Sequence, residues 1–208
     1  VYDRESVRAI AALCDSRGIT IISDEVYAAI YYDCAPISPA SFSPRCVVVD
    51  SLSKTFSMTG WRLGWCIVPE NMILPLAAFH QLSVTCASAV SQYAAIFALR
   101  GGADAEKEAN LRELARRRNL AIACLKRNGL AFVEPAGAFY IMVDVTTRLP
   151  RFGTSLDLAK AFLAREKVVT IPGSAFGAGG EGYLRLSFAA APADIEEGVR
   201  RLARFLQD

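Results

Sequence analysis

The stretch Arg45-Cys-Val-Val-Val-Asp50-Ser-Leu-Ser-Lys54 joins a short apolar run to a group of small polar side chains and a lysine. A continuous run of β-branched residues is typical of a strand buried on both faces, as in the centre of an α/β sheet. In open sheets of this kind, ligands bind just beyond the carboxyl ends of the strands. The stretch therefore predicts an α/β fold and places Lys54 where a ligand would bind.

The segments around this strand have patterns typical of the same fold class. Apolar spacing predicts three helices and two further strands in the first half of the chain. The helices are expected over residues 5–17, 71–82 and 88–99, and the strands over 20–23 and 62–68. Gly101-Gly102 then interrupts the chain.

The second half begins with a long helix and has a different pattern of predicted helices and strands. Residues 104–128 are rich in Ala, Leu, Glu and Arg, and Asn128-Gly129 is a helix-end signal. Beyond it, strands are expected over 138–144, 168–171 and 183–188, and helices over 155–166 and 193–206. We therefore predict two domains, residues 1–110 and a smaller α/β sandwich of residues 111–208, with the long helix linking them.

The composition argues against several classes of protein. The chain has 208 residues, with 23 Lys plus Arg against 21 Asp plus Glu, so its formal charge of +2 gives no support for nucleic-acid or membrane-surface binding. Six scattered cysteines and a single histidine argue against a metal site, and apolar surroundings indicate buried thiols at positions such as Cys46 and Cys66. The run 116–118 of three arginines is interpreted as a solvated face. We expect a cytoplasmic globular protein without bound metal, nucleic acid or membrane.

Two clusters of side chains could carry chemistry. Asp24 and Tyr27 follow the strand expected over 20–23, although Asp24 could instead cap the next helix. A lysine amine at position 54 is placed to attack a carbonyl group, although the alternative is a solvated lysine in a flexible loop.

Residues 51–64, Ser-Leu-Ser-Lys-Thr-Phe-Ser-Met-Thr-Gly-Trp-Arg-Leu-Gly, resemble the lysine signature of class I/II aminotransferases, which are fold-type I enzymes that use pyridoxal 5'-phosphate. Three further motifs agree with the resemblance: Ser-Asp-Glu-Val-Tyr at 23–27, Ile-Pro-Gly-Ser-Ala-Phe-Gly at 171–177 and Gly-Tyr-Leu-Arg-Leu-Ser-Phe at 182–188. The resemblance implies that residues 1–110 form part of the mixed, mostly parallel sheet of the large cofactor-binding domain. It covers the whole chain but only the second half of a family member.

The resemblance implies a role in cofactor chemistry for three residues. Lys54 would form the internal Schiff base with pyridoxal phosphate and transfer the substrate's α-proton. Asp24 would pair with the protonated pyridine nitrogen, and Tyr27 would hydrogen-bond the phenolic oxygen of the cofactor.

Four further residues would anchor ligands. By the same resemblance, Ser51, Ser53 and Arg62 would hold the cofactor's phosphate through charge-assisted hydrogen bonds. Arg185 would clamp the α-carboxylate of the substrate, because a planar guanidinium makes two parallel bonds to a carboxylate. The alternative for Arg185 is an exposed arginine on an edge strand, which would contribute little.

The implied reaction is transamination between an α-amino acid and a 2-oxo acid, in a homodimer of the full-length protein. The same lysine and cofactor also serve C–S or β-lyases, so a lyase is one alternative. A non-catalytic, aminotransferase-like effector domain of a transcriptional regulator is the other. Because the family's remaining cofactor contacts are expected in the first half, we expect this chain by itself to be weakly active or inactive.

Overall fold

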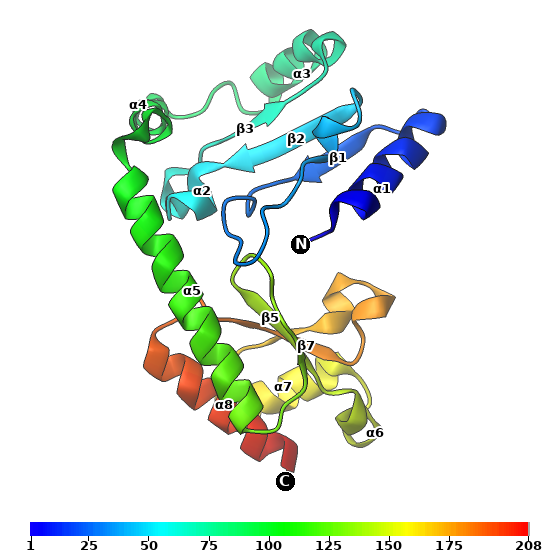
Figure 1. Ribbon diagram of the computed structural model, residues 1–208, viewed down its shortest axis with the longest axis vertical. Helices are drawn as coiled ribbons and strands as arrows, with labels where there is room; N and C mark the ends of the chain where they lie inside the picture. The colour runs from blue at the N-terminus through cyan, green and yellow to red at the C-terminus, as the bar shows by residue number, and fades with distance from the viewer. Residues whose placement is uncertain (208) are drawn as a thin grey trace. The chain divides into compact units, whose positions relative to one another are not determined.

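The strand expected from the run of valines, β2 (Cys46–Ser51), lies at the centre of a three-stranded sheet (Figure 1). It pairs in parallel with β1 (Ile21–Asp24) and antiparallel with β3 (Gly64–Ile67). The carboxyl ends of β1 and β2 and the start of β3 therefore meet at one edge of the sheet. Strand ends of this kind are where α/β sheets bind ligands.

The computed structural model describes residues 1–207, and the chain divides into two units, Val1–Asn110 and Leu111–Asp208. The first unit contains the mixed sheet, and the second contains a four-stranded sheet in which all pairs are antiparallel. The predicted α/β fold class is confirmed. No helix among residues 1–207 combines the length and apolarity needed to cross a membrane.

The first unit contains the three predicted helices together with a short one that the sequence did not predict. They are α1 (Arg4–Ser16), α2 (Leu52–Thr55), α3 (Glu70–Ser83) and α4 (Ala89–Phe97), with short 3-10 turns η1 (Pro39–Ser41) and η2 (Thr59–Trp61) and a π-helical turn η3 (Ala98–Gly102). The carboxylate of Asp3 starts α1 by accepting the Ser6 N–H at 2.8 Å, which satisfies one of the unpaired amides of a helix N-terminus. Val7 and Ala11 form the buried face of α1.

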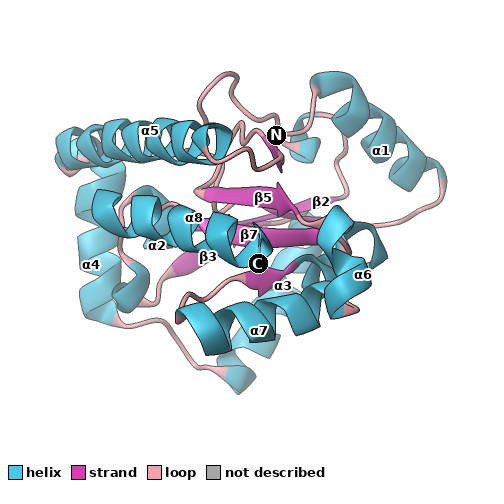
Figure 2. Ribbon diagram, turned by 90° about the horizontal axis from the view of Figure 1, so that it is seen from below, coloured by secondary structure: helices cyan, strands magenta, loops and turns pink. Residues whose placement is uncertain are grey.

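The second unit is a sheet covered by helices on one face (Figure 2). Its strands lie in the order β4 (Phe132–Val133), β5 (Tyr140–Asp144), β7 (Tyr183–Ser187) and β6 (Ile171–Pro172). Its helices are the later part of α5 (Asp104–Arg127), then α6 (Leu149–Phe152), α7 (Ser155–Glu166) and α8 (Pro192–Gln207), with 3-10 turns η4 (Thr146–Arg148), η5 (Gly173–Phe176) and η6 (Ala178–Gly180).

Alternation along the strands of this second sheet separates its two faces. Ile141, Val143 and Leu184 are buried, whereas Tyr140 and Arg185 are only half-buried. Because successive side chains of a strand point to opposite faces, one face packs into the core of this unit and the other is only partly covered. The α/β sandwich expected for the second half is present.

Three local predictions are wrong. The strand expected over 168–171 is reduced to Ile171–Pro172, and Pro172 has no N–H to extend the ladder. Arg118 is buried, with its Nε donating to the Pro135 carbonyl at 2.6 Å, because consecutive helical residues point in different directions and cannot share one solvated face. Cys66 is exposed, since its partner Val49 on β2 is 38% exposed and this face of the sheet is open.

The turn that follows β6 depends on close backbone contact. A Cβ atom on Gly173 would overlap the carbonyl oxygen of Gly180, so the two segments can approach only because position 173 lacks a side chain. Ser155 fixes the same turn from inside: it is fully buried, its Oγ donates to Glu181 Oε2 at 2.9 Å, and it accepts the Ser174 N–H at 3.3 Å. Backbone fit and a buried polar network together set the shape of this turn.

We expect Gly173→Ala to lower the free energy of unfolding by about 2 kcal/mol, because the added methyl group forces two backbones apart. Gly179→Ala is the matched control in the same turn, since a Cβ there meets no heavy atom within 4 Å. Urea unfolding followed by circular dichroism measures both variants. Equal midpoints for the two variants would show that the backbone contact does not constrain the turn.

Candidate functional site

The predicted cofactor-binding residues of the first unit come from strand ends at one edge of its sheet. Asp24 is the last residue of β1, Ser51 is the last residue of β2, and Arg62 lies two positions before β3. The register pairs Asp24 with Val49 and Ser51 with Gly64, so the three ends lie next to one another. Parallel pairing of β1 with β2 thus gathers residues that are far apart in the sequence.

Lys54 is held in the short helix α2. Ser51 caps this helix, with its Oγ accepting the Ser53 N–H at 3.2 Å, and the fully buried Leu52 anchors it. Lys54 is half-buried, and its Nζ lies over the ring of Tyr27 at 5.8 Å from the centroid. The structure therefore brings together two residues that the sequence singled out separately.

The turn that carries Tyr27 is tied to the sheet on one side and to η1 on the other. The Glu25 N–H donates to the Val49 carbonyl at 2.8 Å, and the Ile30 N–H donates to the Tyr27 carbonyl at 2.8 Å. Ser38 Oγ donates to the Glu25 carboxylate at 2.5 Å. Glu25 thus fixes the position of Tyr27, a contribution that the sequence pattern did not reveal.

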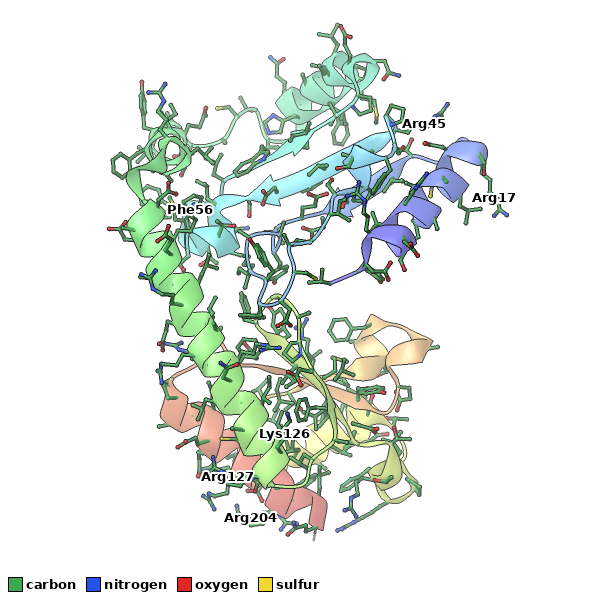
Figure 3. All side chains as sticks on the ribbon, in the orientation of Figure 1. Arg17, Arg45, Phe56, Lys126, Arg127 and Arg204 are labelled. Carbon is green, nitrogen blue, oxygen red and sulfur yellow. The ribbon has the colours of Figure 1, made fainter. Side chains whose placement is uncertain are left out.

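Apolar residues of the lysine signature pack against α4 and hold the polar ones in place. Leu52, Ala95 and Ala98 form a buried cluster, and the side chains packed against it are those of Phe56, Met58, Leu63, Trp65 and Ala103. The start of α5 adds contacts to the loop after Lys54, which carries Phe56 (Figure 3). Lys107 Nζ lies 5.8 Å from the Phe56 ring centroid, and Asn110 Nδ2 lies 3.4 Å from Ser57 Oγ. The loop that carries Lys54 is therefore packed on several sides.

Asp24 belongs to a group of acidic side chains at this edge. Its Oδ1 accepts the Val26 N–H at 3.2 Å, so it caps a turn rather than a helix. Burial raises the pKa of Asp50, and the nearby carboxylates of Glu25 and Asp24 raise it further, although the Ser51 N–H bond to Asp50 Oδ1 at 2.6 Å lowers it. Burial is the largest cause of this shift, and the carboxylates of Glu25 and Asp24 add a smaller electrostatic part because like charges disfavour ionisation.

Arg62 and Gly64 owe their positions to backbone constraints. Arg62 has a left-handed backbone, with φ of 52°, and its exposed guanidinium donates from Nη1 to the Thr59 carbonyl at 2.8 Å. A Cβ on Gly64 would lie 2.8 Å from the carbonyl oxygen of Asp50, so β3 can approach Ser51 only with glycine there. The backbone of Arg62 thus lies two positions before the residue that pairs with Ser51, and its guanidinium bonds to the Thr59 carbonyl.

In the second unit, Arg185 lies on β7, between β5 and β6. It is paired with Met142 and Ile171 and is half-buried, which removes the alternative of an exposed edge-strand arginine. Its Cζ lies 4.1 Å from the ring centroid of Tyr140 and 4.7 Å from that of Phe176. These aromatic neighbours were not predicted as site residues.

Comparison with known proteins gives a consistent result across sequence and structure. The family described as aminotransferase class I and II matches residues 1–202. The probable aspartate/prephenate aminotransferase of Aquifex aeolicus is 38% identical, over 100% of this chain and 54% of its own length. Aromatic-amino-acid aminotransferase 2 of Thermococcus litoralis is 37% identical, with the same coverage of each chain.

Solved structures agree with these relatives. The aromatic aminotransferase from Pyrococcus horikoshii OT3 superposes with a TM-score of 0.91 at 37% identity, covering 100% of this chain and 56% of that one. The aspartate aminotransferase from Thermus thermophilus with maleate gives a TM-score of 0.90 at 31% identity, covering 99% and 53%. The chain spans about half the length of the curated relatives it matches. By sequence and by fold, it belongs to the aminotransferase class I and II family.

Proposed function

We propose that the protein containing this chain transfers an amino group from an α-amino acid to a 2-oxo acid, with pyridoxal 5'-phosphate as cofactor and Lys54 as its attachment point. The observation that carries the proposal is the placement of the Lys54 amine over the Tyr27 ring at the edge of the sheet where Asp24 and Ser51 end their strands. The relatives, whose names include aspartate, aromatic-amino-acid and valine–pyruvate aminotransferases, share amino transfer rather than one substrate. We propose no particular side chain for the substrate.

The residues at this edge fit the chemical groups of pyridoxal phosphate. An aldehyde requires an amine, which Lys54 supplies, and a pyridine nitrogen that is kept protonated requires an anion, which Asp24 supplies. The carboxylates that raise the Asp50 pKa make that side of the edge favourable for a cationic ring nitrogen. The hydroxyls of Ser51 and Ser53 and the guanidinium of Arg62 suit a phosphate dianion.

When bound, the cofactor supplies an electron sink for the negative charge left on the substrate's α-carbon. The remaining tasks fall to this chain. Lys54 Nζ removes the α-proton as general base, and packing of the surrounding loop keeps the amine in position. Tyr27 would donate a hydrogen bond from its hydroxyl to the cofactor's phenolic oxygen, and Asp24 would pair with the pyridine nitrogen. Arg185 would bind the α-carboxylate and so orient the substrate. We also propose a homodimer, as the family resemblance implies.

The reaction type is tested by assaying the gene product with amino acids of different side chains, with and without 2-oxoglutarate. Transamination predicts that the amino acid is consumed only when the 2-oxo acid is present, and that glutamate appears in equal amount. Release of ammonia without a 2-oxo acid would instead indicate a lyase. No reaction under either condition would indicate a non-catalytic protein.

We expect Lys54→Ala to lower turnover by at least about 10⁴-fold, since general base catalysis alone contributes 10²–10⁴-fold and cofactor attachment is lost with it. Lys160→Ala is the matched control, because Lys160 is an exposed lysine on α7. Steady-state kinetics of both purified variants provide the measurement. A Lys54→Ala enzyme as fast as the control would remove this lysine from the mechanism.

We expect Asp24→Asn to lower kcat by about 10–1000-fold, because an adjacent carboxylate raises the pKa of a cationic partner by 1–3 units and the amide cannot. The amide can still accept the Val26 N–H that holds the turn, so the fold is expected to remain intact. Kinetics together with circular dichroism separate the two effects. An unchanged kcat would contradict the assignment of Asp24 to the ring nitrogen.

A further inference from the structure

We propose that Tyr140 and Phe176 position the Arg185 guanidinium for carboxylate binding through contacts with their two aromatic rings. The inference rests on the proposed function, in which Arg185 binds the α-carboxylate of the substrate. Tyr140 and Phe176 act through Arg185 and are therefore positioning residues.

The register of the second sheet places Tyr140 beside Arg185. Met142 on β5 is directly opposite Arg185 on β7, and Tyr140 precedes Met142 by two positions. Side chains two apart on a strand share a face, and diagonal neighbours across a strand pair are within reach of long side chains. The Arg185 Cζ accordingly lies 4.1 Å from the Tyr140 ring centroid.

Phe176 reaches the same guanidinium from a different segment. Phe176 is the last residue of the turn η5, and its ring centroid lies 4.7 Å from the Arg185 Cζ. The backbone contact between Gly173 and Gly180 and the buried hydroxyl of Ser155 fix this turn, so Phe176 is held independently of β5. Because its ring is still 51% exposed, its contact with Arg185 is not explained by burial in the core.

Two ring centroids, from separate segments of the chain, lie 4.1 and 4.7 Å from the same guanidinium carbon. Such close rings restrict rotation of the guanidinium, while its N–H groups remain suited to a carboxylate. The rings carry no net charge, so these contacts do not neutralise the arginine. The Arg185 side chain therefore loses less conformational freedom when a carboxylate binds, and this preorganisation increases the affinity for the carboxylate.

The ring variants separate this role from a general loss of structure. We expect Tyr140→Leu and Phe176→Leu each to weaken carboxylate binding about threefold, and the double variant about tenfold, as for partly exposed cation–π contacts. Tyr140→Phe and Phe176→Tyr keep a ring and are expected to bind within about 1.5-fold of the wild type. Phe152→Leu is the matched control. The Phe152 ring centroid lies 5.3 Å from the Cζ of Arg151, and no ligand is proposed for Arg151.

The experiment uses the gene product loaded with pyridoxal phosphate. Isothermal titration calorimetry gives dissociation constants for maleate and for 3-phenylpropionate, which are an acidic and an aromatic carboxylate. Single-turnover rates with alanine and with ethylamine, which lacks the carboxylate, give a second measure. We expect the leucine variants to lower the alanine-to-ethylamine ratio, whereas a purely structural defect would slow both substrates equally.

Arg185→Leu distinguishes the possible failures. We expect this variant to weaken carboxylate binding about 100-fold, as for loss of a charged hydrogen-bond partner. If Arg185→Leu weakens binding but the leucine variants of Tyr140 and Phe176 bind like the wild type, the positioning role is wrong and the proposed function stands. If Arg185→Leu binds like the wild type, or neither probe binds the wild type, the carboxylate site itself is wrong and the inference fails with it.

Discussion

The parallel pairing of β1 with β2 is the constraint on which the first unit depends. In this pairing, Ile21 lies opposite Cys46 and Asp24 lies opposite Val49, so the carboxyl ends of both strands are at one edge of the sheet. A slip of one residue would turn every side chain of β1 to the opposite face and move Asp24 along the edge. The ladder thus does more than hold the sheet together, because it determines which polar groups lie near the lysine.

Packing then restricts the loop that the ladder positions. Buried Leu52 and its apolar neighbours fix α2 against α4, and Glu25 holds the turn of Tyr27 through Ser38 and the Val49 carbonyl. Rigid support of this kind limits the motion of the lysine amine. In the proposed function, the acidic side chains at this edge and the guanidinium of Arg62 would supply opposite charges for the two ends of the cofactor.

The sequence predicts well whatever depends on local signals. A strand can be recognised from its run of valines, and a helix end from the signal at Asn128-Gly129, because each signal lies within a few neighbouring residues. The structure contains the elements that these signals predict. What could not be predicted depends on contacts between distant segments. Phe176 and Tyr140 meet Arg185 through register and turn geometry, and the burial of Arg118 depends on a carbonyl group from a later loop.

The central claim is that one amine of this chain carries pyridoxal phosphate, and chemical trapping tests it most directly. The gene product is incubated with pyridoxal phosphate, reduced with borohydride, digested and mapped by mass spectrometry over its five lysines in this region, Lys54, Lys107, Lys126, Lys160 and Lys167. We expect stoichiometric label on Lys54, with only trace label at the other four. Stoichiometric label on another lysine, or no label on any of them, would contradict the claim.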